Sequence, residues 1–221
     1  METSPLTSSM PDEYPCPSVT ADVVVWLVSG GQPHVLLIRR RHGPYEGYWA
    51  LPGGFMDITE TLEETARREL AEETGITDVP LEPLRPFDAP ERDPRKRVIT
   101  MAFLALLYEP KGEVSLCAGD DAAAARWWPV RELPPLAFDH DQIIAAARAH
   151  LRRRLLGEDL GRRLLPEPFT ARALRHVFSA VLGEPISARP VLRLLRAAGV
   201  IEDLGGGLYR YQTSDQPWPY L

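Results

Sequence analysis

Three glutamates near the middle of the chain stand at a spacing that suits metal chemistry. Glu72 and Glu73 follow Glu69 by three and four residues, so on a helix all three carboxylates project from one side of one turn. Like charges at this spacing repel one another, by about a few tenths of a kcal/mol per pair. Carboxylate oxygens are the ligands that Mg²⁺ and Mn²⁺ prefer. The cluster therefore predicts a divalent-cation site, against the alternative of a solvated, charge-rich surface helix.

Two features beside the glutamates strengthen this interpretation. Arg68 lies four residues after Glu64 and four before Glu72, so its guanidinium can steady a carboxylate through a charge-assisted hydrogen bond. Gly53 and Gly54 lie just upstream, and a chain without side chains lets the backbone approach a ligand closely. A backbone carbonyl at this point could complete the shell of a bound metal.

The spacing continues beyond the glutamates and resembles a known signature. Five residues separate Gly54 from Glu60, and seven more separate Glu60 from Arg68. The fixed residues that follow are Glu69, Leu70, Glu72, Glu73, Gly75 and Ile76. This pattern resembles the Nudix box at all nine of its defined positions over twenty-three residues. The preceding sequence WALPGG is also similar to that family.

The resemblance implies a reaction: attack of water on a diphosphate that links a nucleoside to a further group, assisted by Mg²⁺ with Mn²⁺ as a substitute. By position, the implied metal ligands are the carboxylates of Glu69, Glu72 and Glu73 and the carbonyl of Gly54. Glu60 and Arg68 match supporting groups. The general base in this family is often a box glutamate, which here means Glu72 or Glu73, but in some members it lies on a separate loop. Asp120 and Asp121 are the candidates for that role, unless they form a plain turn.

The substrate is expected to meet arginines. The loop Phe87–Arg97 contains Arg92, Arg95, Lys96 and Arg97, which could bind phosphates or a terminal ribose, although a basic exposed turn is an equal alternative for each. In the strand expected over Val35–Arg41, alternation places Arg39 and Arg41 on one face. The segments that resemble a Nudix subgroup acting on or sensing ADP-ribose are FDAPERDPRKRVIT, AGDDAAAARW and LAFDHD.

Elements that could position these residues follow from the apolar pattern. Strands are expected over Val19–Val28, Val35–Arg41, Trp49–Pro52, Val98–Tyr108 and Ala125–Trp128. A helix is expected from Thr61 to Thr74, ended by Gly75, and another after Asp139, whose carboxylate would cap it, to about Leu156. The predicted class is α+β, and the resemblance implies an α/β/α Nudix sandwich with a mixed sheet over residues 17–156. Residues 1–16 are expected to form a disordered or extended tail.

The last quarter of the chain has a different pattern. After an expected linker at residues 157–169, Thr170 and Ser187 stand where they would cap two helices, and a glycine-rich turn then separates two short strands. This order predicts a winged helix-turn-helix over residues 170–221, similar to the domain carried by Nudix-related transcriptional regulators of NAD metabolism. Arg189, Arg193 and Arg196 would meet DNA on its second helix.

Charge and composition bound the function. Residues 1–150 carry 14 Lys/Arg against 24 Asp/Glu, whereas residues 151–221 carry 11 against 7. The basic tail predicts a polyanionic partner, or a surface that docks on the acidic front. No apolar run is long enough to span a membrane, and two distant cysteines, Cys16 and Cys117, suit a reducing cytoplasm.

Two hypotheses of different classes therefore stand. One is a diphosphohydrolase acting on ADP-ribose. The other is a DNA-binding regulator that senses an ADP-ribose-like ligand. A homodimer is expected in either case.

Overall fold

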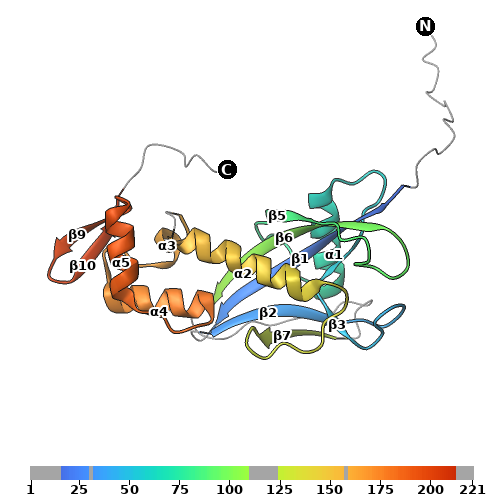
Figure 1. Ribbon diagram of the computed structural model, residues 1–221, viewed down its shortest axis with the longest axis horizontal. Coiled ribbons are helices and arrows are strands. Elements are labelled where there is room, and N and C mark those ends of the chain that lie inside the picture. The colour runs from blue at the N-terminus through green and yellow to red at the C-terminus, as the bar shows by residue number, and fades with distance from the viewer. Residues whose placement is uncertain (1–15, 30–31, 110–123, 157–158, 213–221) are drawn as a thin grey trace, which may run out of the picture.

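The computed structural model describes residues 16–29, 32–109, 124–156 and 159–212. Ten strands and five helices occur in these ranges (Figure 1). The strands are β1 Ser18–Ser29, β2 Gln32–Arg39, β3 Trp49–Ala50, β4 Gly53–Phe55, β5 Glu82–Phe87, β6 Val98–Glu109, β7 Ala125–Pro129, β8 Phe169–Thr170, β9 Ile201–Gly205 and β10 Leu208–Tyr211. The helices are α1 Leu62–Thr74, α2 His140–Leu156, α3 Asp159–Leu164, α4 Ala171–Leu182 and α5 Ala188–Ala197.

A mixed seven-stranded sheet forms the larger part of the molecule. Its main path runs β3-β2-β1-β6-β5, with β4 paired to β1 and β7 paired to β2. Strands β1 and β6 are parallel from Ser18↔Val98 to Ser29↔Glu109, while β1 is antiparallel to β2 and β4. The sheet is thus mixed, as predicted.

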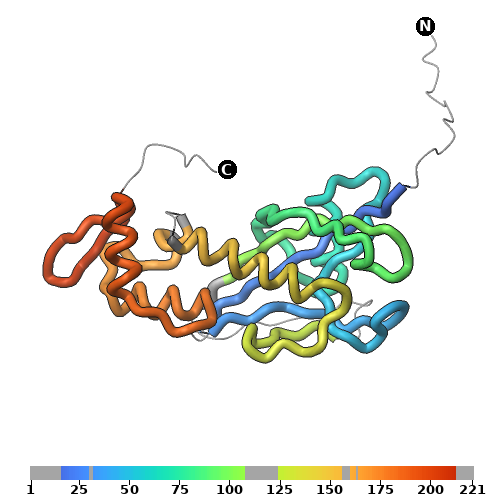
Figure 2. The backbone as a smooth tube through the Cα atoms, viewed as in Figure 1, coloured from blue at the N-terminus to red at the C-terminus, as the bar shows by residue number. Residues whose placement is uncertain are grey.

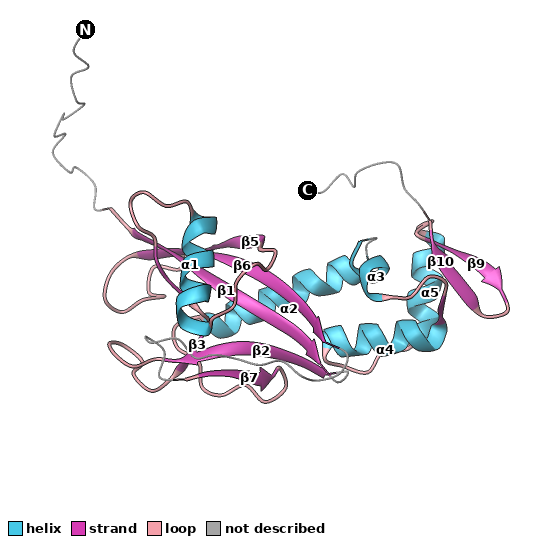
Figure 3. Cartoon of the chain, turned by 180° about the vertical axis from the view of Figure 1, so that it is seen from behind, coloured by secondary structure: helices cyan, strands magenta, loops and turns pink. Residues whose placement is uncertain are grey.

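Helices cover both faces of this sheet, because its central strand is apolar on both sides. Val24 and Trp26 of β1 belong to a core shared with α2, whereas Val23 and Val25 belong to a core shared with α1. Figures 1 and 3, seen from opposite sides, show α2 and α1 on opposite faces. The α+β class and the sandwich architecture predicted from the sequence are confirmed.

The C-terminal part lies at one end of the sheet (Figure 2). Two helices, α4 and α5, are followed by the hairpin β9–β10, and β8 adds to it in the order β8-β10-β9. This is the helix–helix–hairpin order that the sequence predicted. Its buried residues Phe178 and Leu195 belong to the same apolar core as Trp26 and α2, so the two parts are packed together.

The structure corrects three local expectations. Residues 157–169, predicted as a linker, contain α3 and the first residue of β8, since Leu160, Leu165 and Phe169 are buried in the core. The carboxylate of Asp139, predicted as the cap of α2, accepts hydrogen bonds from Arg92 at 2.7 and 3.1 Å. Strand β5 lies in a stretch for which no element was predicted. No helix in the described part of the chain is long and apolar enough to cross a membrane.

Candidate active site

Helix α1 is fixed in place by its caps and its apolar face. Thr61 accepts from the backbone N–H of Glu64, and the Glu64 carboxylate accepts from the N–H of Thr61, which forms a capping box. Gly75 ends the helix in the left-handed conformation. Ala66 and Leu70 are fully buried against the sheet. These contacts turn the glutamates toward β4.

Glu73 lies against the backbone of the glycine pair. Its Oε2 accepts a hydrogen bond of 2.9 Å from the N–H of Gly53. Burial, together with the nearby carboxylates of Glu69 and Asp22, raises the pKa of Glu73 to about 8. In the metal-free protein this carboxyl therefore holds a proton at neutral pH.

Both glycines are required by close approach. A Cβ on Gly54 would stand 2.3 Å from Oε1 of Glu69, and a Cβ on Gly53 would stand 2.3 Å from the carbonyl oxygen of Ala21. Gly53 also has a φ of 154°, which side chains rarely adopt. The Glu69 carboxylate thus sits directly over the backbone of β4, and burial raises its pKa as well.

Arg68 organises the remaining carboxylates. Its Nε and Nη2 donate to the two oxygens of Glu60 at 2.7 and 3.0 Å, and its Nη1 donates to Glu69 at 2.7 Å and to Glu72 at 3.3 Å. The hydrogen bonds from Arg68 hold the pKa of Glu60 down to about 2. The fork-like pair is the strong, oriented kind of ion pair. Glu60 therefore positions Arg68, which in turn orients Glu69 and Glu72.

The donor chemistry suits a hard cation, although the carboxylates are not yet gathered. Within the described residues, no three His, Cys, Asp or Glu side chains converge as a ready metal-binding group. Two of these carboxylates, Glu69 and Glu72, instead accept hydrogen bonds from the same atom, Nη1 of Arg68. The pKa values of Glu69 and Glu73 are raised by desolvation and, for Glu73, by Glu69 itself. A divalent cation would relieve this repulsion once the carboxylates turn toward it.

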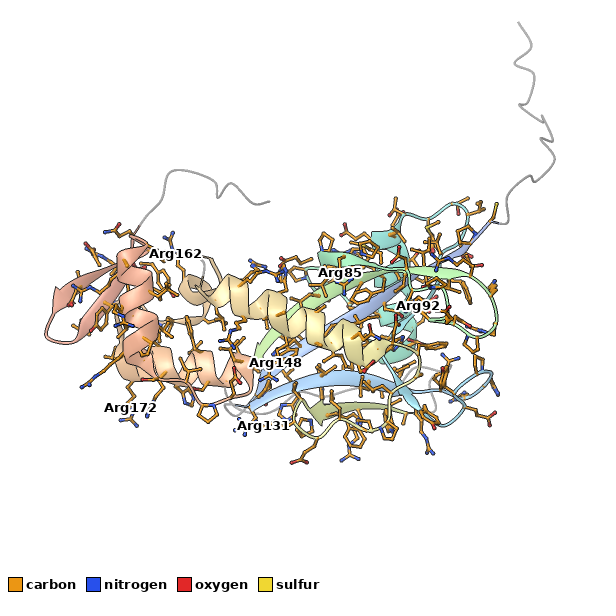
Figure 4. The ribbon with its side chains drawn as sticks, viewed as in Figure 1. Arg85, Arg92, Arg131, Arg148, Arg162 and Arg172 are labelled. Atoms are coloured by element: carbon orange, nitrogen blue, oxygen red, sulfur yellow. The ribbon has the colours of Figure 1, made fainter. Side chains whose placement is uncertain are left out.

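A pocket adjoins the glycine pair. Its lining includes Gly53 and Gly54, the aromatic residues Phe55 and Phe138, and the guanidinium groups of Arg40, Arg92 and Arg95. Its polar wall is a buried network. Arg92 binds Asp139 through two hydrogen bonds and lies 3.5 Å from Asp22, and Asp22 also accepts from Thr100 at 2.7 Å. Figure 4 labels Arg92 near the start of α2.

His140 completes this wall. Its Nδ1 accepts from the backbone N–H of Leu51 at 2.8 Å, so the neutral ring carries its proton on Nε2. Burial lowers the pKa of His140, which keeps the ring neutral. Neither Asp22 nor His140 was predicted as a site residue, because the two are far apart in the sequence and only the fold brings β1 and the start of α2 together.

The predicted substrate arginines are distributed differently in the structure. Arg92 lines the pocket, but its side chain is 4% exposed and is held by Asp139 and Asp22. Arg39 is exposed and donates to the carbonyl of Gly47, and Arg97 is exposed and donates to the carbonyl of Asp88. Arg41 is also exposed, outside the pocket lining. Strand β2 ends at Arg39, so the alternation that paired Arg39 with Arg41 does not extend to Arg41.

Arg40 and Arg95 line the pocket together with Arg92. Arg40 donates to the carbonyls of Pro44 and His42, and its pKa is lowered by burial and by the neighbouring charge of Arg95. Arg95 is held by the carboxylate of Asp93 at 2.7 Å. Two like charges kept close together in one pocket favour an anionic ligand. Asp120 and Asp121 lie outside the described residues.

The three arginines predicted to meet DNA share one surface. Arg189, Arg193 and Arg196 of α5 line a shallow groove together with Tyr209 of β10. Arg196 also pairs with Asp203 at 3.1 Å. The arrangement presents cationic side chains and one aromatic ring on a single face of the C-terminal part.

The family model of the NUDIX domain matches residues 18–147. An ADPR responsive transcriptional repressor, NtrR, of Acinetobacter baylyi is 31% identical over 86% of this chain and 77% of its own length. An ADP-ribose pyrophosphatase of Methanocaldococcus jannaschii is 44% identical over 50% of this chain, which spans 63% of that relative. The crystal structure of Shewanella oneidensis NrtR complexed with a 27mer DNA is similar with a TM-score of 0.60 and 32% identity, covering 88% of this chain and 93% of that one.

The match to the NUDIX model confirms the resemblance to the Nudix family that the box spacing indicated. The matched range contains α1, the glycine pair and every residue that lines the pocket. Because the match spans more than half of the sequence, this chain belongs to the NUDIX family.

Proposed function

We propose that this chain is a Mg²⁺-dependent diphosphohydrolase that cleaves ADP-ribose to AMP and ribose 5-phosphate. The observation that carries the proposal is the convergence of Glu69, Glu73 and the Gly53–Gly54 backbone at the edge of a pocket lined by guanidinium groups. The similarity to an ADP-ribose pyrophosphatase over half of the chain supports the choice of substrate.

Each group has a task in this reaction. Glu69, Glu72, Glu73 and the carbonyl of Gly54 would hold the divalent cation. When bound, the cation would neutralise the diphosphate and make the attacking water more acidic. Arg68, held by Glu60, orients Glu69 and Glu72.

The substrate is placed by the pocket. Arg40 and Arg95 bind its phosphates while water attacks one phosphorus and the anhydride P–O bond breaks. The general base is a glutamate of the box or Asp121. We also propose a cytoplasmic location, supported by the two widely separated cysteines.

The decisive experiment incubates the purified chain with Mg²⁺ and a panel of nucleoside diphosphate derivatives and nucleoside triphosphates, and follows AMP and phosphate release. We expect AMP from ADP-ribose, with little turnover of triphosphates. Efficient hydrolysis of triphosphates with ADP-ribose untouched would contradict the substrate and leave the family unchanged.

A second function is favoured by the C-terminal part. The NtrR repressor is similar over 86% of this chain, and the α5 groove carries Arg189, Arg193 and Arg196 beside Tyr209. We propose as the alternative that the chain is an ADP-ribose-sensing regulator that binds DNA through α5, as a homodimer. Because α5 carries three arginines and Arg196 is paired with Asp203, one copy would bind DNA weakly. Pairing two copies would raise the affinity through effective concentration.

Anisotropy titrations with DNA from upstream of the protein's own gene, with and without ADP-ribose, separate the two functions. With two or three phosphate contacts per copy, log K should fall with log salt at a slope of roughly −2 to −3 per copy. Tight, ligand-sensitive binding would favour the regulator. Absence of binding at low salt would leave the hydrolase alone.

A further inference from the structure

Two residues with strained backbones meet beside the pocket: Phe138, which lines it, and Tyr45, which contacts the Phe138 ring. Tyr45 and Phe138 have φ values of 63° and 54°, a left-handed conformation that is unusual for bulky side chains. Tyr45 follows β2 and Phe138 precedes α2, yet their rings are 4.9 Å apart in an edge-to-face arrangement. Strain of this kind persists only where the surrounding structure imposes it, and it is concentrated at functional sites. The strain at Tyr45 and Phe138 therefore points to a ligand-binding role for their contact.

The surrounding contacts fix the Phe138 ring. The guanidinium of Arg40 lies over this ring at 4.9 Å, and Nε of Arg40 donates to the carbonyl of Pro44, next to Tyr45. The two residues after Phe138 are held as well, since Asp139 binds Arg92 and His140 accepts from Leu51. The ring is thus in place on the pocket wall before any ligand enters.

The pocket offers aromatic and guanidinium surfaces and also reaches the catalytic edge. Phe55 lines it too, with Arg95 over its ring at 5.6 Å, and Arg95 is 6.0 Å from Phe138. Gly53 and Gly54 line the same pocket beside Glu69 and Glu73. Aromatic faces and guanidinium planes are the surfaces on which planar nucleobases stack.

We propose that Phe138 stacks the nucleobase of the substrate and that Tyr45 is the positioning residue that holds the Phe138 ring for this contact. This proposal rests on the proposed function, and it makes Phe138 the residue that selects the base-bearing half of a nucleoside diphosphate. The diphosphate then lies over Gly53–Gly54, and the second half of the substrate extends away from Phe138.

The test compares the two products as ligands. Phe138→Leu keeps an apolar side chain but removes the aromatic face. We expect the dissociation constant for AMP, measured by calorimetry, to rise by about tenfold or more, while that for ribose 5-phosphate stays within twofold of wild type. In hydrolysis of ADP-ribose, KM should rise more than kcat falls, as expected for lost ground-state binding. Weaker binding of ribose 5-phosphate alone, or unchanged AMP binding, would overturn the proposal.

Variants of the tyrosines guard against misfolding as an explanation. Tyr45→Ala should weaken AMP binding, whereas Tyr45→Phe, which keeps the ring, should restore it. Tyr48→Ala is the matched control, because the Tyr48 ring lies 5.8 Å from that of Tyr45, whereas the edge-to-face contact with Phe138 at 4.9 Å is made by Tyr45. An equal loss in Tyr45→Phe or Tyr48→Ala would contradict the positioning role. If wild type binds AMP but leaves ADP-ribose intact, the proposed hydrolysis fails while the stacking contact is still tested; if wild type binds no AMP, the stacking proposal fails.

Discussion

At the scale of single residues, burial and charge make Glu73 sensitive to pH. The pKa of its carboxyl is raised from 4.5 to about 8, so between these values the folded, metal-free protein binds a proton that the unfolded chain does not bind. The free energy of unfolding should therefore decrease as pH rises through this window. Glu73→Gln removes the titration and keeps an oxygen that can accept from Gly53. Near pH 4.5 we expect variant and wild type to be similarly stable, and above pH 8 we expect the variant to be more stable by at least about 1 kcal/mol.

Denaturant unfolding in the presence of a chelator, at pH 5 and pH 8.5, measures this difference. Glu63→Gln on the same helix is the control, because the Glu63 carboxylate is exposed and paired with Arg67; its effect should be small at both pH values. A Glu73→Gln effect that is the same at pH 5 and pH 8.5 would show that Glu73 does not titrate in this range.

Arg40 and Arg39 are neighbours in the sequence, but we expect only Arg40 to contact the substrate. Arg40 lines the pocket, whereas Arg39 is exposed and donates to the carbonyl of Gly47. Arg40→Ala should raise KM for ADP-ribose by about tenfold with a smaller change in kcat, because it removes binding that substrate and transition state share. Arg39→Ala should leave both constants near wild type. Steady-state kinetics of the two variants tests this expectation. A larger increase in KM for Arg39→Ala than for Arg40→Ala would show that the substrate does not bind in this pocket.

At the scale of elements, the sequence predicts best where local signals agree. Helix α1 begins after Thr61 and ends at Gly75 as expected, since both its caps and its apolar residues are local features. Strand β5 was not predicted, because Pro83 and Pro86 argue against a strand. Strand β5 tolerates these prolines because it lies at the edge of the sheet, where a missing N–H on the open side costs no hydrogen bond to a neighbouring strand. Helix α3 was not predicted either, since six residues containing Gly161 show no clear period.

The residues at the N-terminal ends of α1 and α5 differ in the structure, and of the two only Ser187 was predicted as a cap. Thr61 accepts from Glu64 N–H within a capping box, whereas Ser187 makes no side-chain cap hydrogen bond to α5. Thr61→Ala should therefore lower the free energy of unfolding by about 1 kcal/mol. Ser187→Ala should change it by less than about 0.5 kcal/mol. Urea unfolding of the two variants checks this, and equal costs would contradict the capping geometry.

At the scale of the whole molecule, long-range contacts decide what the sequence leaves open. Arg131 and Arg148 donate to the carbonyls of Gly183 and Leu182 at the end of α4, and Figure 4 labels both at the junction of the two parts. Arg148 and Arg152 also pair with Glu184. A basic tail docking on an acidic front was one expectation. At this junction one ion pair has the opposite polarity, because Arg148 of the acidic front binds Glu184 of the basic tail.

One apolar core joins the sheet, α2 and the C-terminal helices. We therefore expect a single cooperative transition, with the tryptophan fluorescence and the helical circular dichroism changing together. Two transitions, with helical signal lost before tryptophan fluorescence changes, would mean that the C-terminal part unfolds independently. Arg148→Ala should shift this one transition without splitting it.

The central claim is that the glutamates of α1 carry out hydrolysis of ADP-ribose, and the most direct measurement is the turnover of Glu73→Gln. With saturating Mg²⁺, wild type should release AMP and ribose 5-phosphate. The variant should be slower by about a hundredfold or more, equivalent to about 2.7 kcal/mol in the activation barrier, while its circular dichroism and thermal unfolding show an intact fold. Wild-type turnover by Glu73→Gln would contradict the account.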